Sequence, residues 1–229
     1  MNNENKKSVI ILIGPIGAGK DTQADVLADK LHLFRLRTSQ LLEDKFDNVK
    51  PDNPDYEKLQ KEKALWAGGI LNTPEWVLSV VQEKVKEIAS EGQGIIFSGS
   101  PRTLFEAEGL MPFLEKLYGR EAIRIFSISL NEDESIKRNS KRLICKQNLH
   151  PIDPELVKKR IIKCPIDGSE LMTRELDKPE TIKIRYQEYL NRTAPIIDYF
   201  KDRGLKIADV NGEQSIEKVF QDILEKLND

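Results

Sequence analysis

A glycine-rich turn between a strand-like run and a helix-like run constrains this chain more than any other feature. Residues 8–13 are mostly β-branched, and the apolar residues within 24–31 recur at helical spacing. Between them lies Gly14-Pro15-Ile16-Gly17-Ala18-Gly19-Lys20. Such glycines let backbone N–H groups turn inward around phosphate oxygens, and the dipole of the following helix favours an anion. The segment therefore predicts a strand, a phosphate-binding loop and a helix.

The residues that follow this loop depart from its usual form. Lys20 is expected to meet the β and γ phosphates of a nucleoside triphosphate. The usual motif places Ser or Thr directly after the lysine, whereas here Asp21 intervenes and Thr22 supplies the hydroxyl. The loop predicts triphosphate binding but not a reaction, because switch GTPases and ATPase motors share it.

The rest of the chain alternates between short apolar runs and helical periodicity. Further strands are predicted at 33–37, 94–98, 123–130 and 205–210, and an amphipathic helix at 216–227 follows Ser215 as its N-cap. This alternation predicts an α/β fold of three layers with a parallel five-stranded sheet. Two polar stretches, 38–69 and 143–171, interrupt it. We therefore expect a core made of 1–37, 70–142 and 172–229 with two excursions.

Composition narrows the class of protein and its partners. The 229 residues carry a net charge of −2, which argues against a nucleic-acid-binding surface. No apolar run approaches the roughly 18 residues of a membrane span, and we expect no leader, because the residues before the first strand lack the charged-then-apolar pattern. Two cysteines are too few for a disulfide framework. We expect a cytoplasmic monomer with no nucleic-acid or membrane partner.

From these motifs onward the chain resembles adenylate kinases along almost its whole length. The loop resembles that family's phosphate loop, with its Gly-Thr-Gln ending changed to Asp21-Thr22-Gln23. Gly99-Ser100-Pro101-Arg102-Thr103 is similar to the family's Gly-Phe-Pro-Arg-Thr. The resemblance implies a P-loop fold and a nucleoside monophosphate kinase. Such an enzyme uses ATP and Mg²⁺, with AMP as the expected acceptor.

The resemblance also implies roles for individual residues. Arg102 would grip the monophosphate, Arg138 and Arg142 would clamp the triphosphate from one helical face, and Arg174 and Arg185 would bracket the transferring group. Residues 38–69 would form a monophosphate-binding flap and 143–171 a lid. Asp177, Pro179 and Glu180 resemble a helix start, with Pro in the first turn and Asp-x-x-Glu imitating a capping box, and this helix would carry Arg185 on an early turn. The expected substrate-binding set is completed by Thr38, Leu71, Gly99 and Glu106.

Several positions differ from the family's pattern. Glu43 stands where an arginine should hold the monophosphate, and Ser98 where an aspartate commonly helps to hold Mg²⁺. Leu176 likewise replaces an acid. Glu106 replaces a glutamine that reads adenine, and an ionised carboxylate would suit guanine. Three alternatives to an AMP kinase stay open: a GMP kinase, a kinase for another small acceptor, and a degenerate kinase that binds nucleotide with little turnover.

The expected lid contains a candidate zinc site. Some family members bind zinc there through two pairs of ligands, and Cys164-x2-Asp167 preserves the second pair. Cys145 begins the first pair, but its partner position is Asn148, so His150 is the candidate fourth ligand. Two alternatives remain: a hydrogen-bonded lid with two thiols, and a disulfide between the cysteines.

Overall fold

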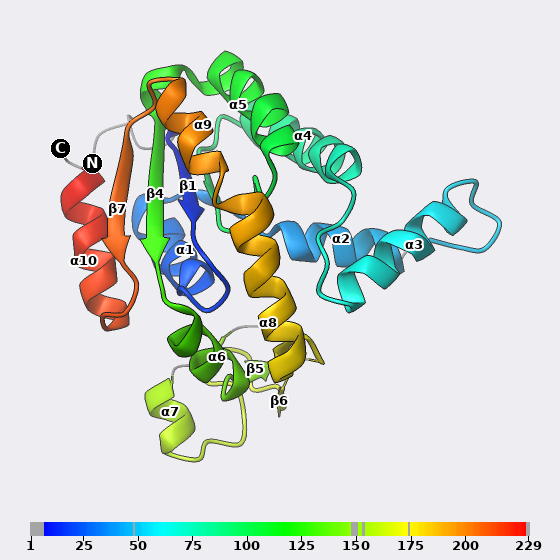
Figure 1. Ribbon diagram of the computed structural model, residues 1–229, viewed down its shortest axis with the longest axis vertical. Coiled ribbons are helices and arrows are strands. Elements are labelled where there is room, and N and C mark those ends of the chain that lie inside the picture. Colours follow the sequence, from blue (N-terminus) through cyan, green and yellow to red (C-terminus); the bar gives the residue numbers. More distant parts are fainter. Residues whose placement is uncertain (1–6, 48, 148–150, 153, 174, 228–229) are drawn as a thin grey trace.

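The fold is built on one parallel sheet. The computed structural model describes residues 7–47, 49–147, 151–152, 154–173 and 175–227 (Figure 1). Five strands pair in the order β2-β3-β1-β4-β7, and all of the pairings are parallel. The strands are β1 (Val9–Ile13), β2 (Phe34–Leu36), β3 (Ile95–Phe97), β4 (Ile123–Ser129) and β7 (Ile207–Asn211). The predicted α/β class and the five-stranded parallel sheet are confirmed.

The central strand β1 is buried on both faces. Ile11 pairs with Phe97 of β3 and with Ile125 of β4. Successive side chains of a strand point to opposite faces, so Ile11 belongs to one apolar core and Ile10 to a second one. This double burial explains why the run is apolar throughout rather than alternating.

Helices cover both faces and complete three layers. One core includes Val81, Leu110 and Phe200, and the other includes Leu27 and Ile223. The first face is covered by α4 (Pro74–Ser90), α5 (Leu104–Tyr118) and α9 (Ile196–Asp202), and the second by α1 (Lys20–Leu31) and α10 (Ile216–Leu227) (Figure 1). The predicted cap of α10 is confirmed, because the Ser215 hydroxyl accepts a hydrogen bond from the Lys218 N–H at 3.3 Å.

The first excursion is a pair of helices that projects away from the sheet (Figure 1). It consists of α2 (Thr38–Asp47) and α3 (Tyr56–Ala67). Phe46 of α2 packs on Trp76 of α4 with ring centroids 5.6 Å apart, and on Trp66 of α3 at 6.4 Å. Aromatic packing therefore joins the base of this pair to the body of the molecule.

The second excursion has a small core of its own. In it, β5 (Ile144–Cys145) pairs antiparallel with β6 (Leu171–Met172), and α7 (Pro154–Lys158) lies between them in the chain. Cys145, Ile152 and Cys164 are buried together. This unit lies below α6 (Glu132–Ser140) and α8 (Pro179–Glu188) in Figure 1.

Three short helical turns complete the described elements. The turns are two 3₁₀ turns, Arg120–Ala122 and Glu175–Asp177, and a π-helical turn, Tyr189–Thr193. The helices of the described segments are not long and apolar enough to cross a membrane.

The predicted start of α8 is confirmed, because Pro179 lies in the first turn of the helix, but two details of the prediction are wrong. The N-cap position is Lys178, which makes no side-chain cap, and Arg185 lies in the last turn of the helix rather than an early one. The Asp177 carboxylate accepts hydrogen bonds from Arg142 instead of capping the helix. A charge-assisted bond to a guanidinium is stronger than a bond to a backbone N–H, so the tertiary partner prevails.

Candidate functional site

The phosphate-binding loop follows the carboxyl end of β1, and its shape requires glycine. Gly17 and Gly19 have φ of +81° and +85°, in the left-handed region that disfavours side chains. A Cβ on Gly14 would lie 2.3 Å from the carbonyl oxygen of Ile128, and one on Gly17 would lie 2.4 Å from Asn139 Nδ2. The loop is therefore held against neighbouring elements at distances that only glycine permits.

Two buried side chains of helix α6 hold this loop in place, and their role was not predicted from the sequence. The buried Ser135 donates from Oγ to the carbonyl oxygen of Ile16 at 2.6 Å. The buried Asn139 donates from Nδ2 to the Ser135 carbonyl oxygen at 2.7 Å. The available signal was the pair of small polar residues at i, i+4 in an otherwise charged helix.

Lys20 lies at the mouth of the loop. Its ammonium donates to the carbonyl oxygens of Gly14 at 2.7 Å and Pro15 at 2.8 Å. Desolvation lowers the pKa of Lys20 to about 7, with the Arg102 guanidinium as the next cause. Burial and the neighbouring guanidinium therefore disfavour the charged form of Lys20 unless an anion binds next to it.

Two further arginines contribute to this shift, so four cations converge here. Arg185 and Arg142 also lower the pKa of Lys20, while Asp21 opposes them. Arg102 precedes α5, Arg142 follows α6 and Arg185 belongs to α8. Segments far apart in the chain therefore bring positive charge to the phosphate loop, as the expected roles of these residues require.

Asp21 joins the loop to the neighbouring strand β3. Its Oδ1 accepts hydrogen bonds from Ser98 Oγ at 2.8 Å and from an Arg35 terminal nitrogen at 3.0 Å. The Arg35 guanidinium and the hydrogen bond from Ser98 lower the pKa of Asp21 to about 2. Asp21 is therefore ionised across the physiological pH range.

The carboxyl ends of β2 and β3 bring Thr38 close to the segment that contains Arg102. Thr38, which is buried, donates from Oγ1 to Ser100 Oγ at 3.0 Å. A Cβ on Gly99 would lie 3.2 Å from Thr38 Oγ1 and 3.6 Å from an Arg102 terminal nitrogen. Gly99 thus allows the start of α2 to approach the Arg102 segment closely.

Glu106 is part of the start of α5. Its carboxylate accepts hydrogen bonds from the Arg102 N–H at 2.9 Å and from Thr103 Oγ1 at 3.0 Å. Thr103 Oγ1 in turn accepts from the Glu106 N–H at 3.2 Å. Burial raises the pKa of Glu106, and these hydrogen bonds partly offset the effect. The carboxylate therefore helps to cap this helix in an arrangement like a capping box, but the returning bond comes from the N–H of Arg102, one residue before the N-cap Thr103.

Arg142 and Arg185 meet at one buried carboxylate. Arg142 donates from Nε and from a terminal nitrogen to Asp177 at 3.0 and 2.7 Å, and Asp177 is only 3% exposed. Arg185 lies 3.8 Å from the same carboxylate and donates to the Leu176 carbonyl oxygen at 3.3 Å. Asp177 thus holds two guanidinium groups in place.

The expectation that Arg138 and Arg142 share one helical face is wrong. Helix α6 ends at Ser140, two residues before Arg142, so helical spacing does not apply. Arg138 donates to Glu134 at 2.9 Å and to the Gly212 carbonyl oxygen at 2.8 Å, away from Asp177. The two guanidinium groups have different partners.

The return from the first excursion contacts α8. The Leu71 N–H donates to Glu188 at 3.2 Å. A Cβ on Gly69, whose φ is +78°, would lie 2.8 Å from a methyl carbon of Thr181 and 3.1 Å from Arg185 Cγ. Of the expected site residues, Arg174 lies outside the described ranges.

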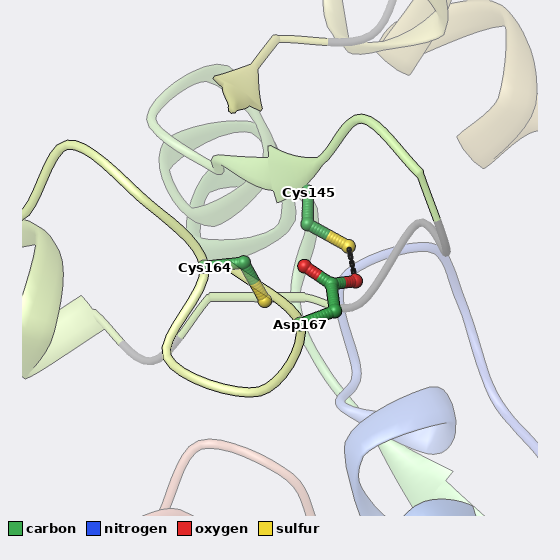
Figure 2. A group of neighbouring side chains, drawn as sticks. All are labelled: Cys145, Cys164 and Asp167. Atoms are coloured by element: carbon green, nitrogen blue, oxygen red, sulfur yellow. Dashed lines mark hydrogen bonds between the residues drawn. The ribbon is translucent and has the colours of Figure 1, made fainter. Parts of the chain in front are cut away.

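Three of the four candidate zinc ligands gather in the second excursion (Figure 2). The ligand atoms of Cys145, Cys164 and Asp167 lie within 4.8 Å of one another. Cys145 Sγ donates to Asp167 Oδ2 at 3.2 Å, and Asp167 Oδ1 accepts from the Ser169 N–H and hydroxyl at 2.9 and 2.7 Å. In this structure both cysteines are free thiols. The fourth candidate, His150, lies outside the described residues.

Comparison with known proteins decides the family. A family model for adenylate kinase matches residues 12–205. Curated proteins named adenylate kinase align over nearly the whole chain: that of Caldicellulosiruptor bescii is 32% identical, covering 95% of this chain and 98% of its own. That of Listeria innocua is 33% identical, covering 93% and 96%, and that of Lactobacillus johnsonii is 33% identical, covering 93% and 95%.

The chain belongs to the adenylate kinase family. Membership shows a phosphotransferase of the nucleoside monophosphate kinase class that uses ATP, and it implies Mg²⁺. The phosphate loop follows β1 at the carboxyl ends of parallel strands, where open α/β sheets bind their ligands.

Proposed function

We propose that this protein transfers the γ-phosphoryl group of ATP to AMP and so forms two molecules of ADP. One observation carries the proposal: arginines from three separate segments gather around the phosphate loop, since Arg142 and Arg185 share the buried Asp177 carboxylate and, with Arg102, lower the pKa of Lys20. Two nucleotides that meet at a transferring group need positive charge from several directions. The adenylate kinase relatives support the same reaction.

The arginines and Lys20 supply the stabilisation that this chemistry requires. The loose transition state of phosphoryl transfer spreads negative charge over three oxygens, and fixed cations stabilise it without reorganising. Arg142 is fixed by Asp177, and Lys20 by two loop carbonyl groups. We assign triphosphate contacts to Lys20, Arg138 and Arg142. Arg102 contacts the monophosphate, and Arg174 and Arg185 the transferring group.

The donor side offers oxygen ligands that suit Mg²⁺. Thr22 supplies a hydroxyl in the first turn of α1, directly after Lys20 and Asp21, and hydroxyl, carboxylate and phosphate oxygens are the ligands this ion prefers. When bound, Mg²⁺ neutralises part of the charge on the phosphates.

We favour AMP over GMP as the acceptor. A guanine-reading role for Glu106 would need its carboxylate to face the base. Both carboxylate oxygens instead accept hydrogen bonds at the start of α5. Glu106 therefore has a structural role at the start of α5, and the choice of AMP over GMP is supported by the adenylate kinase relatives.

We propose a structural zinc ion in the lid, formed by 143–171. Two cysteine sulfurs and one carboxylate oxygen lie within 4.8 Å of one another, and the serine bonds to Asp167 orient that carboxylate. Three such ligands need one more to complete a tetrahedron, and His150 is the candidate.

We also propose that the protein is a monomer and works in the cytoplasm. A single chain supplies every residue assigned above, and the unlinked cysteines suit a reducing compartment. Light scattering during size-exclusion chromatography would give a mass near 26.2 kDa for a monomer, and a mass twice as large would contradict it.

A coupled assay for ADP tests the proposed reaction. ATP and Mg²⁺ are supplied with AMP, GMP, CMP or UMP in turn, and Lys20→Ala serves as the control. We expect the highest turnover with AMP and a loss of at least about 100-fold in the variant, because Lys20 is an electrostatic stabiliser of the transition state. Nucleotide binding without turnover would instead indicate a degenerate kinase, and turnover with GMP alone would assign the other acceptor.

A further inference from the structure

We propose that Asp21 supplies, from the first turn of α1, the Mg²⁺-holding carboxylate that Ser98 no longer supplies from the end of β3. This inference rests on the proposed function and adds a positioning residue to it. The two positions are 77 residues apart in the chain, yet Ser98 Oγ donates to Asp21 Oδ1 at 2.8 Å. The site therefore still has a carboxylate, and α1 contributes it in place of the one that the family commonly has after β3.

The placement of Asp21 suits a group that holds a metal or its water shell. It lies between Lys20, which meets the phosphates, and Thr22, which supplies a hydroxyl. Its side chain is 60% exposed. The two hydrogen bonds described for Asp21 both end on Oδ1. A fixed and accessible carboxylate beside a phosphate loop has the hard oxygens that Mg²⁺ prefers.

The Ser98 hydroxyl also explains why the carboxylate occurs at one position only. Aspartates at both positions would place two carboxylates within hydrogen-bonding distance of each other, where the repulsion raises the pKa of one of them. A serine instead donates a hydrogen bond to Asp21 and orients it. Asp21 and Ser98 therefore form a matched pair.

The competing explanation is that Asp21 only neutralises Arg35. Arg35 is 10% exposed and needs a carboxylate partner, but it also forms an ion pair with Asp25. Asp25 lies one helical turn after Asp21 and pairs with Arg37 as well, at 2.8 Å. Arg35 thus has another carboxylate, and Asp25 offers a control on the same helix with the same partner.

Binding of Mn²⁺ to the protein with a non-hydrolysable ATP analogue tests the proposal. Mn²⁺ is the spectroscopic probe, and electron paramagnetic resonance gives its free concentration. We expect Asp21→Asn to weaken Mn²⁺ binding by about 10-fold, as losses of residues that orient metal ligands typically do. Analogue binding without metal is expected not to weaken.

Two further variants make the result specific. The exchange Asp21→Gly with Ser98→Asp is expected to restore Mn²⁺ affinity to within about 3-fold of the original protein, because the metal shell regains one carboxylate. Asp25→Asn is expected to leave that affinity unchanged. The proposal is overturned if Asp21→Asn leaves Mn²⁺ affinity unchanged, if Asp25→Asn weakens it equally, or if the exchanged protein folds but binds Mn²⁺ as weakly as Asp21→Asn.

The metal readout separates this inference from the proposed reaction. Absence of ADP formation by the original protein would overturn the reaction even where Mn²⁺ binding depends on Asp21. Normal ADP formation with Mn²⁺ affinity independent of Asp21 would overturn only the inference.

Discussion

The pKa of Lys20 reflects the charged groups that surround the phosphate loop. Desolvation and the guanidinium groups of Arg102, Arg185 and Arg142 lower that pKa to about 7. Bound phosphates would reverse the balance by favouring the charged ammonium. Nucleotide binding and protonation of one side chain are therefore linked at the residue scale.

We expect ATP binding at pH 8 to take up a large fraction of one proton. The pKa of Lys20 without nucleotide is about 7, so above that pH the amine is mostly neutral and must gain a proton as phosphates bind. Below pH 7 it is already charged, and the uptake by this group disappears. Calorimetry at pH 8 in buffers of different ionisation enthalpy measures the number of protons.

Lys20→Arg is the matched control, because arginine stays charged at every pH of the experiment. Its proton uptake at pH 8 should be close to zero per nucleotide bound, whatever the affinity. Equal uptake by the two proteins would assign the proton to another group.

At the scale of elements, the second excursion is a unit whose small core contains both cysteines. Its two strands are only two residues each, and the main buried residues are Cys145, Ile152 and Cys164. So little apolar burial stabilises a unit weakly, which is the situation in which a metal contributes to folding.

Chelation is expected to lower the Tm of the protein by about 5 to 10 °C, since losing a ligand at a concentration of about 100 times its Kd removes roughly 2.7 kcal/mol of stability. Elemental analysis of the purified protein should find close to one zinc per chain. Added zinc should restore the Tm.

Cys164→Ala is the control for this measurement, and it should contain almost no zinc and ignore the chelator. Original protein that contains no zinc and whose Tm is unaffected by chelation would leave a hydrogen-bonded lid as the explanation of the cluster.

At the scale of the whole molecule, the two excursions follow strands whose carboxyl ends lie at one edge of the sheet. Helices α2 and α3 come after β2, and the cysteine unit comes after β4 and α6 (Figure 1). Gly69 and Leu71 connect the return of the first excursion to α8, which also carries Arg185. Movement of the first excursion would thus be transmitted to α8 and to Arg185.

We expect AMP and a non-hydrolysable ATP analogue, added together, to reduce the radius of gyration measured by small-angle X-ray scattering. Closure of flap and lid over both nucleotides would exclude water from the reaction. The analogue alone is the control and should give a smaller contraction. An unchanged radius with both nucleotides bound, as shown by calorimetry, would contradict closure.

Much of the fold was predictable because its signals are local. The apolar run before Gly14 predicts a buried central strand, and the spacing within 216–227 predicts the helix that ends the fold. Gly17 and Gly19 predict a turn whose backbone angles glycine tolerates. In each of these cases the physical cause acts within a few residues of the chain.

The charged partnerships were decided only by the tertiary structure. Arg138 and Arg142 are four residues apart, yet α6 ends between them and sends them to different partners. Asp177 pairs with Arg142 instead of capping α8, and Asp21 meets Ser98 across 77 residues. The sequence by itself determined the elements and the phosphate loop, because backbone preference and apolar periodicity are local. Only the folded chain decided which long, charged side chains meet, because electrostatic partners are chosen by distance in space.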